Sequence, residues 1–147
     1  MARAIIGIIV GYVVMFILNF LGFVTLYAVI GPDQAFEPGL YLASNKWIAI
    51  SFVIIFITGT IAGLVCAAIA KGGKAPLVLA IVALAIGITL GALHIATQPA
   101  DTHELRTASV PNMEAMTKAR HPVWVVFAGP VIAAIGIGIG GKLRRRS

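Results

Sequence analysis

Histidine and methionine side chains offer the clearest ligand chemistry in this sequence. His94 and His121 lie at the ends of neighbouring apolar segments, His103 lies between them, and Met113 and Met116 belong to the same stretch. Imidazoles from adjacent helices can ligate haem, and imidazole with thioether suits copper. Because the spacing matches no known metal motif, we expect no cofactor, and a haem or copper site at these residues is an alternative.

A second chemical pattern is G-x-G-x-x-G, at Gly136, Gly138 and Gly141. In a dinucleotide-binding loop this spacing follows a strand, opens a helix and precedes an acidic residue about 20 positions on. Here it ends an apolar segment and runs into the basic sequence that starts at Lys142. The pattern therefore predicts a helix surface rather than a nucleotide site.

Catalytic groups are scarce along the chain. The sequence has no G-x-S-x-G, no H-E-x-x-H and no cysteine beside a base, since the single Cys66 lies in an apolar segment. Asn19 is the most deeply placed strongly polar side chain, and we expect it to hydrogen-bond between helices rather than to bind a substrate. We predict a non-catalytic protein, and nothing in the pattern supports an intramembrane enzyme using His94 and Asp101.

Four long apolar segments must position these side chains. The chain has 147 residues and is 60% hydrophobic and 11% charged, whereas soluble domains are about 45–50% apolar and about 25% charged. No Asp, Glu, Lys or Arg occurs in the segments Ala4–Ile30, Trp47–Ala70, Pro76–Ala96 and Pro122–Gly141. A helix of ~20 such residues crosses the hydrocarbon layer. We predict an all-α integral membrane protein with four transmembrane helices in an antiparallel bundle, forming a single domain over residues 1–147.

The first segment has one alternative explanation, a cleavable signal peptide. Its apolar stretch is about twice the usual ~7–15 residues, and no clean small-x-small cleavage site follows it. We therefore expect a retained helix.

Charge predicts the orientation of these segments. Seven basic residues lie on the side of the two termini: Arg3, Lys71, Lys74, Lys142, Arg144, Arg145 and Arg146. Four basic residues and all five acids lie on the other side. Since Lys and Arg collect on the cytoplasmic side, we predict a multi-pass protein of a bacterial inner membrane with both termini in the cytoplasm. The arginine cluster is expected to anchor the chain at the headgroups, together with Trp47 and Trp124 at the opposite boundary, and no nucleic-acid partner is expected.

Each segment also carries two glycines four residues apart, and these pairs predict helix packing. They are Gly7 and Gly11, Gly59 and Gly63, Gly87 and Gly91, and Gly136 and Gly140. Lipid tails give helices no hydrophobic reason to associate, so contact depends on close backbone approach, which such glycines permit. We expect Pro130 to bend the last helix and turn Gly136 and Gly140 outward, toward a neighbouring chain. Gly7 and Gly11 are an alternative docking surface, and the other interpretation is that the glycine pairs only hold this bundle together.

The loops carry further local signals. Ser44 or Asn45 is expected to cap the second long helix, and the sequence after Ser109 predicts a short surface helix in the second outer loop. Glycine and proline predict a tight turn over residues 71–76. Three apolar loop side chains are expected on the membrane surface: Phe36, Leu40 and Tyr41.

These features favour a non-catalytic accessory or structural subunit that packs against other transmembrane subunits of a larger membrane complex. The pattern resembles that of small four-helix proteins of bacterial inner membranes. The alternative is a small oligomeric channel or carrier for a neutral or apolar solute, built around Asn19 and the threonines. A second alternative is the outer-face haem or copper site at His94 and His121.

Overall fold

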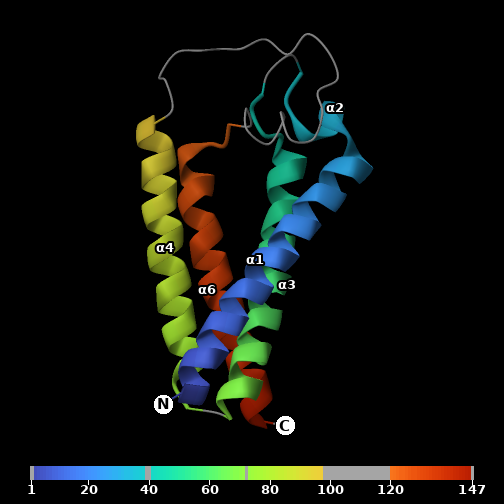
Figure 1. Ribbon diagram of the computed structural model, residues 1–147. Coiled ribbons are helices and arrows are strands. Elements are labelled where there is room, and N and C mark those ends of the chain that lie inside the picture. The colour runs from blue at the N-terminus through green and yellow to red at the C-terminus, as the bar shows by residue number, and fades with distance from the viewer. Residues whose placement is uncertain (1, 39–40, 72, 98–119, 147) are drawn as a thin grey trace.

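The computed structural model describes residues 2–38, 41–71, 73–97 and 120–146. Four helices are long and apolar enough to cross a membrane: α1 (Ala2–Ile30), α3 (Asn45–Ala70), α4 (Ala75–Thr97) and α6 (Val123–Arg146). They pack against one another (Figure 1), which confirms the predicted all-α fold. One short helix that the sequence did not predict, α2 (Pro32–Ala35), follows α1. The surface helix expected after Ser109 lies outside the described residues.

Helices that are consecutive in the sequence run antiparallel, so α3 and α6 run in the same direction (Figure 1). The most extensive interface joins α3 to α6, while α1 packs mainly on α3, and α4 mainly on α6. The contact between α1 and α4 is smaller. In Figure 1 these two helices converge near the N-terminus and diverge toward α2. We call the end with the two termini the terminal half, and the end with α2 the loop half.

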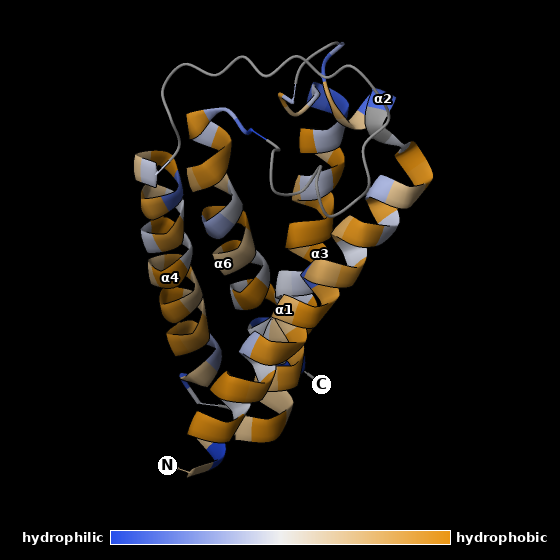
Figure 2. Ribbon diagram, turned by 45° about the horizontal axis from the view of Figure 1, so that its top comes forward, coloured by the Kyte–Doolittle hydropathy of each residue, from blue (hydrophilic) through white to orange (hydrophobic). Residues whose placement is uncertain are grey.

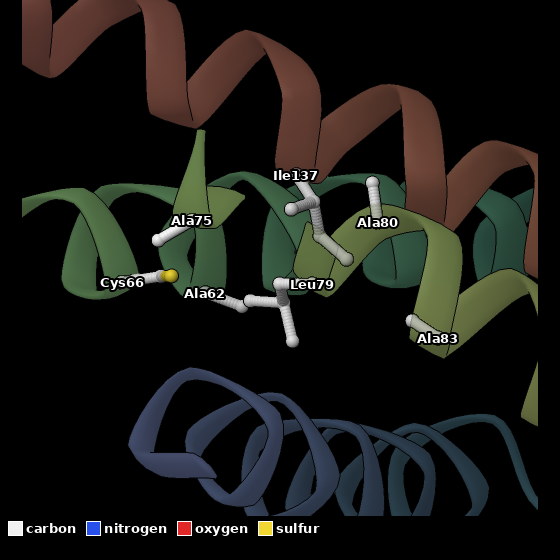
Figure 3. Packing of buried hydrophobic residues seen from close by; sticks show 7 residues of the cluster. All are labelled: Ala62, Cys66, Ala75, Leu79, Ala80, Ala83 and Ile137. Atoms are coloured by element: carbon white, nitrogen blue, oxygen red, sulfur yellow. The ribbon is translucent and has the colours of Figure 1, made fainter. Parts of the chain in front are cut away.

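The main apolar core lies in the terminal half (Figure 3). Its buried members come from α3, α4 and α6: Ala62, Cys66, Ala75, Leu79, Ala80, Ala83 and Ile137. Leu79 and Ile137 are the largest of the fully buried side chains, and most of the others are alanine. Small side chains let the helix backbones approach closely, which is how helices gain packing energy in lipid.

Glycine makes the closest helix contacts of this half. A Cβ atom placed on Gly59 would lie 2.7 Å from the Ala133 carbonyl oxygen, and one on Gly136 would lie 2.6 Å from that of Phe56. Gly63 lies against the backbone of Ile137, and Gly140 against that of Thr60.

The outward-facing glycine surface expected on α6 is therefore wrong. Gly136 and Gly140 are both buried against α3 of the same chain. The α6 helix is continuous from Val123 to Arg146 with Pro130 inside it, and the bend at this proline stays a prediction.

Helix α3 is capped by a side chain at its start and by a left-handed backbone conformation at its end. At its start the Ser44 hydroxyl accepts a hydrogen bond from the backbone N–H of Trp47, as the sequence predicted. At its end Lys71 adopts the left-handed conformation, with φ 52°. The chain then turns through Gly73, which has φ 83°, and enters α4.

The aromatic residues of the first outer loop are buried, so their expected position on the membrane surface is wrong for Phe36 and Tyr41. Phe36 packs against Tyr27 at the end of α1, and Tyr41 packs against Phe36, with Ala35 and Trp47 beside them; Leu40 lies outside the described residues. This loop is also joined by backbone hydrogen bonds to the segment before α6. Arg120 donates to the Tyr41 carbonyl at 2.8 Å, and its own carbonyl accepts from Ala43 at 2.9 Å.

The outward faces of the long helices are apolar over most of their length (Figure 2). In α1 only 11% of the most apolar stretch is buried, compared with 33% in α3. The hydrocarbon of a bilayer accounts for this surface, because a soluble chain would not expose so many large apolar side chains. The chain is therefore a multi-pass membrane protein.

A cavity in the loop half

A cavity of about 620 Å³ lies in the loop half and is lined by all four long helices. Ala83, which belongs to the core of the terminal half, also lines the cavity, so this core forms its floor. Below the cavity α1 and α4 meet where Gly11 packs against Leu79. The cavity is the space left where these two helices diverge (Figure 1).

The cavity lining is mostly apolar. Among the described residues the exceptions are five polar side chains: Tyr12, Asn19, Ser51, His94 and His121. Ligand sites typically measure ~300–1,000 Å³ and combine an apolar wall with a few polar groups. The cavity has this size and this composition.

Asn19 has a defined orientation in this wall. Its side-chain nitrogen donates a hydrogen bond of 3.0 Å to the Met15 carbonyl, one turn back in α1. Its side-chain oxygen is buried and has no donor among the described residues. The sequence predicted that Asn19 hydrogen-bonds to another helix. Within the described residues, its side chain instead bonds to its own helix, α1.

Ser51 is the second polar group of the wall. Its side chain is 7% exposed, and its hydroxyl has no partner in the described part of the chain. The threonines differ, because Thr58, Thr60 and Thr89 each donate to a carbonyl of their own helix and none of them lines the cavity. Of the residues expected to form a solute path, Asn19 therefore lines the cavity and these three threonines do not.

His94 and His121 line the cavity near its loop end. They come from the last turn of α4 and from the residue before Pro122, so the structure brings together two side chains that are 27 positions apart in the sequence. Burial lowers the pKa of His121, and the nearby His94 lowers it further. His121 is therefore mainly neutral at neutral pH.

The geometry of α4 and α6 does not favour haem between these two histidines. A Cβ on Gly91 would lie 2.6 Å from a methyl group of Val126, and one on Gly87 would lie 2.5 Å from the Pro130 ring. Helices held this closely leave little width for a macrocycle between imidazoles one turn away. Within the described residues, no group of three or more His, Cys, Asp or Glu is placed to hold a metal ion. His103, Met113 and Met116 lie outside the described residues.

The remaining site residues have mixed environments. Trp124 is 58% exposed at the start of α6, where lipid headgroups suit an indole ring. Trp47 instead packs against Phe23 and Tyr27, with ring centroids 6.3 and 6.2 Å apart. Arg144 is exposed at the end of α6, and the side chains of Arg145 and Arg146 lie outside the described set.

Sequence reasoning did not identify Ser51 as part of a site. A serine in an apolar helix commonly bonds to its own backbone, so the residue type alone carried no signal. Only the folded chain shows which residues line the same cavity as Ser51 and that its hydroxyl has no partner among the described residues.

The chain matches no known protein-family model, no curated protein and no solved structure.

Proposed function

We propose that this protein binds an uncharged, largely apolar small molecule in the loop-half cavity and acts as a membrane carrier or binding protein for it. The observation that carries the proposal is the cavity of about 620 Å³, whose apolar wall contains buried polar groups without partners. Buried polar groups without partners are costly. A ligand with a complementary group would remove part of that cost.

The position of the cavity also supports a ligand that arrives through the lipid. Leu90 and Ile86 of α4 line the cavity and are 59% and 36% exposed on the outer surface of the bundle. The opening thus lies beside side chains that face hydrocarbon. An apolar solute concentrates in hydrocarbon, whereas an ion does not.

An accessory subunit of a larger membrane complex is the second candidate. The glycine pairs no longer support it, because they contact helices of the same chain. Its support is the face of α1, where large apolar side chains are exposed along the helix, among them Phe16 at 65%. Stoichiometric transmembrane partners after purification in mild detergent would favour this candidate over the first.

Photolabelling tests the binding proposal. The purified chain in lipid nanodiscs is exposed to decane carrying a diazirine, with and without excess unlabelled decane. Specific binding predicts labelling of cavity residues such as Met15 that excess decane suppresses. Lipid-exposed residues such as Phe16 should label without saturation, because they meet the probe dissolved in the bilayer.

A pair of glycine variants provides the matched control. Gly129 lines the cavity, and a Cβ there would meet only Ile55, at 3.7 Å. Gly129→Leu should therefore fold, fill the cavity and abolish the saturable labelling. Gly138 lies on the same helix with nothing within 4 Å, so Gly138→Leu should retain it. Equal labelling of both variants would contradict the proposal.

We also propose that the protein lies in a bacterial inner membrane with both termini in the cytoplasm. The described residues at the terminal half include the exposed Arg3, Lys71, Lys74, Lys142 and Arg144, as the positive-inside rule requires. In intact cells a membrane-impermeant thiol reagent should label Asn45→Cys but not Lys74→Cys. The reverse pattern would invert the topology.

A further inference from the structure

The two unpartnered oxygens of the cavity wall indicate what kind of polar group a ligand should carry. A carbonyl oxygen can only accept hydrogen bonds, so the Met15 carbonyl requires the nitrogen of the Asn19 amide to face it, at 3.0 Å. The Asn19 oxygen is thereby left as an acceptor, buried and without a donor in the described residues. It needs a donor from the ligand.

Ser51 adds a hydroxyl that can donate or accept. On α3 it lies between Trp47 and Ile54, which contact Phe23 and Gly22 of α1. Asn19 lies one turn further toward the terminal half. The two polar groups are therefore about one helical turn, roughly 5 Å, apart along the bundle.

Polarity is unevenly distributed along the cavity. His94 and His121 lie at its loop end, and Ser51 and Asn19 follow. Toward the floor the wall contains Met15, Ala83 and Ala133, with Tyr12 as the one polar residue. This gradient matches an amphiphile with its polar end toward the loop half and its chain toward the terminal half.

We propose that the cavity selects an uncharged lipid alcohol, whose hydroxyl donates to the Asn19 oxygen and accepts from the Ser51 hydroxyl, with the hydrocarbon chain directed toward Met15 and Ala83. The inference rests on the proposed function. Charged headgroups are disfavoured because the described residues that line the cavity include no Asp, Glu, Lys or Arg, and an uncompensated charge at membrane depth is costly.

Binding requires a small rearrangement of the wall. The Asn19 and Ser51 oxygens are both buried in the unliganded chain, so neighbouring side chains must turn aside before a hydroxyl reaches them. A serine hydroxyl changes position by rotation about one bond, and Met15 is a flexible neighbour in the same wall.

Two photolabels that differ in whether the oxygen carries a hydrogen or a methyl group test the inference. Decanol and decyl methyl ether, each with a diazirine at the far end of the chain, are compared in nanodiscs by competition with their unlabelled forms. The ether keeps the oxygen and the chain but cannot donate. Since an unsatisfied buried acceptor costs free energy, the alcohol should bind about tenfold more tightly.

Variants assign this preference to Asn19. Asn19→Leu keeps the size of the side chain and removes the acceptor, so it should bind alcohol and ether equally. Ser51→Ala removes a donor from which both ligand oxygens can accept, so it should weaken the binding of alcohol and ether alike and leave the preference in place. Thr89→Val is the control, because the Thr89 hydroxyl is exposed, bonds to Ala85 and lies outside the cavity lining; it should keep the full preference.

The outcomes separate the two proposals. Saturable labelling that is equal for alcohol and ether in the unmodified chain would overturn the lipid-alcohol inference and leave the binding function standing. Absence of saturable labelling with either probe would overturn both. The labelled positions test the orientation, because a terminal diazirine should reach Met15 or Ala83, and labelling confined to His94 and His121 would contradict the proposed direction of the chain.

Discussion

The two halves of the bundle are built from the same helices but packed in different ways. In the terminal half, glycines place the backbone of α6 directly against that of α3, and α1 against α3. In the loop half α4 still packs closely on α6 through Gly87 and Gly91, yet α1 diverges from α4 (Figure 1). The terminal half is a packed core, and the loop half contains an open cavity of about 620 Å³.

The difference follows from which side chains α1 presents at each level. Gly7 and Gly11 allow α1 to lie on the backbone of α3 near Cys66 and Ala62. Further along, α1 presents Phe23 and Tyr27, which pack against Trp47 instead of against α4. Aromatic side chains keep the axes of packed helices further apart, whereas glycine allows the helix backbones to come into contact. Residue size along one helix therefore decides where the bundle is closed.

The largest predicted effect concerns the closed half. Gly63→Ala would place a methyl group against the backbone of Ile137. Backbone atoms cannot rotate away, so we expect the upper part of the usual range for overpacking, about 3 kcal/mol lost from the free energy of unfolding. Thermal unfolding in mild detergent, followed by circular dichroism, should show a melting temperature lower by roughly 6–12 °C.

Gly138→Ala is the matched control on α6. Nothing lies within 4 Å of a Cβ at this position, and alanine favours helix over glycine by up to ~1 kcal/mol. Its melting temperature should therefore be unchanged or slightly higher. If the two alanine variants were equally stable, close backbone packing would not be what holds the terminal half together.

An intermediate effect is expected at the loop end. The Ser44 hydroxyl accepts from the Trp47 N–H at 3.2 Å and donates to the Gln34 carbonyl at 2.6 Å, so it connects the start of α3 to α2. Ser44→Ala should cost about 1 kcal/mol, as is usual for the loss of a helix N-cap. Chemical denaturation should place this variant between the unmodified chain and Gly63→Ala. Thr89→Val, which removes a hydroxyl bonded only to Ala85, should match the unmodified chain.

The sequence predicted the helices well because their cause is local. Charge-free segments of sufficient length must form helices in lipid, whatever their neighbours are. The expected span from Trp47 to Ala70, for example, corresponds to the helix Asn45–Ala70. The Ser44 cap was also predictable, since it depends on one side chain and the next turn of backbone.

Partners across the bundle were not predictable in the same way. The spacing of Gly136 and Gly140 indicates a smooth helix face but not which helix covers it, and the face expected to be outward is buried on α3. Phe36 and Tyr41 were expected at the membrane surface because they are apolar loop residues. Their burial against Tyr27 depends on where α1 ends relative to the loop, which the sequence pattern does not specify.

The smallest predicted effect is a dependence on pH that arises at His121 in the loop half. Burial, and the neighbouring His94, lower the pKa of His121 below the ordinary histidine value of about 6.5. The unfolded chain therefore binds a proton at a higher pH than the folded chain does. The contribution of His121 to the free energy of unfolding should be fully present above about pH 6.5. It should decrease as the pH falls toward the lowered pKa of His121.

Urea or detergent unfolding at about pH 7.5 and about pH 5.5 measures this dependence, since these values lie on either side of the ordinary histidine pKa. His121→Gln should lose most of the difference, and His94→Gln should reduce it, because removing the neighbouring imidazole brings the pKa of His121 closer to its ordinary value. If the stability difference between the two pH values persisted in His121→Gln, the acid-sensitive group would lie elsewhere than at the loop end of the cavity.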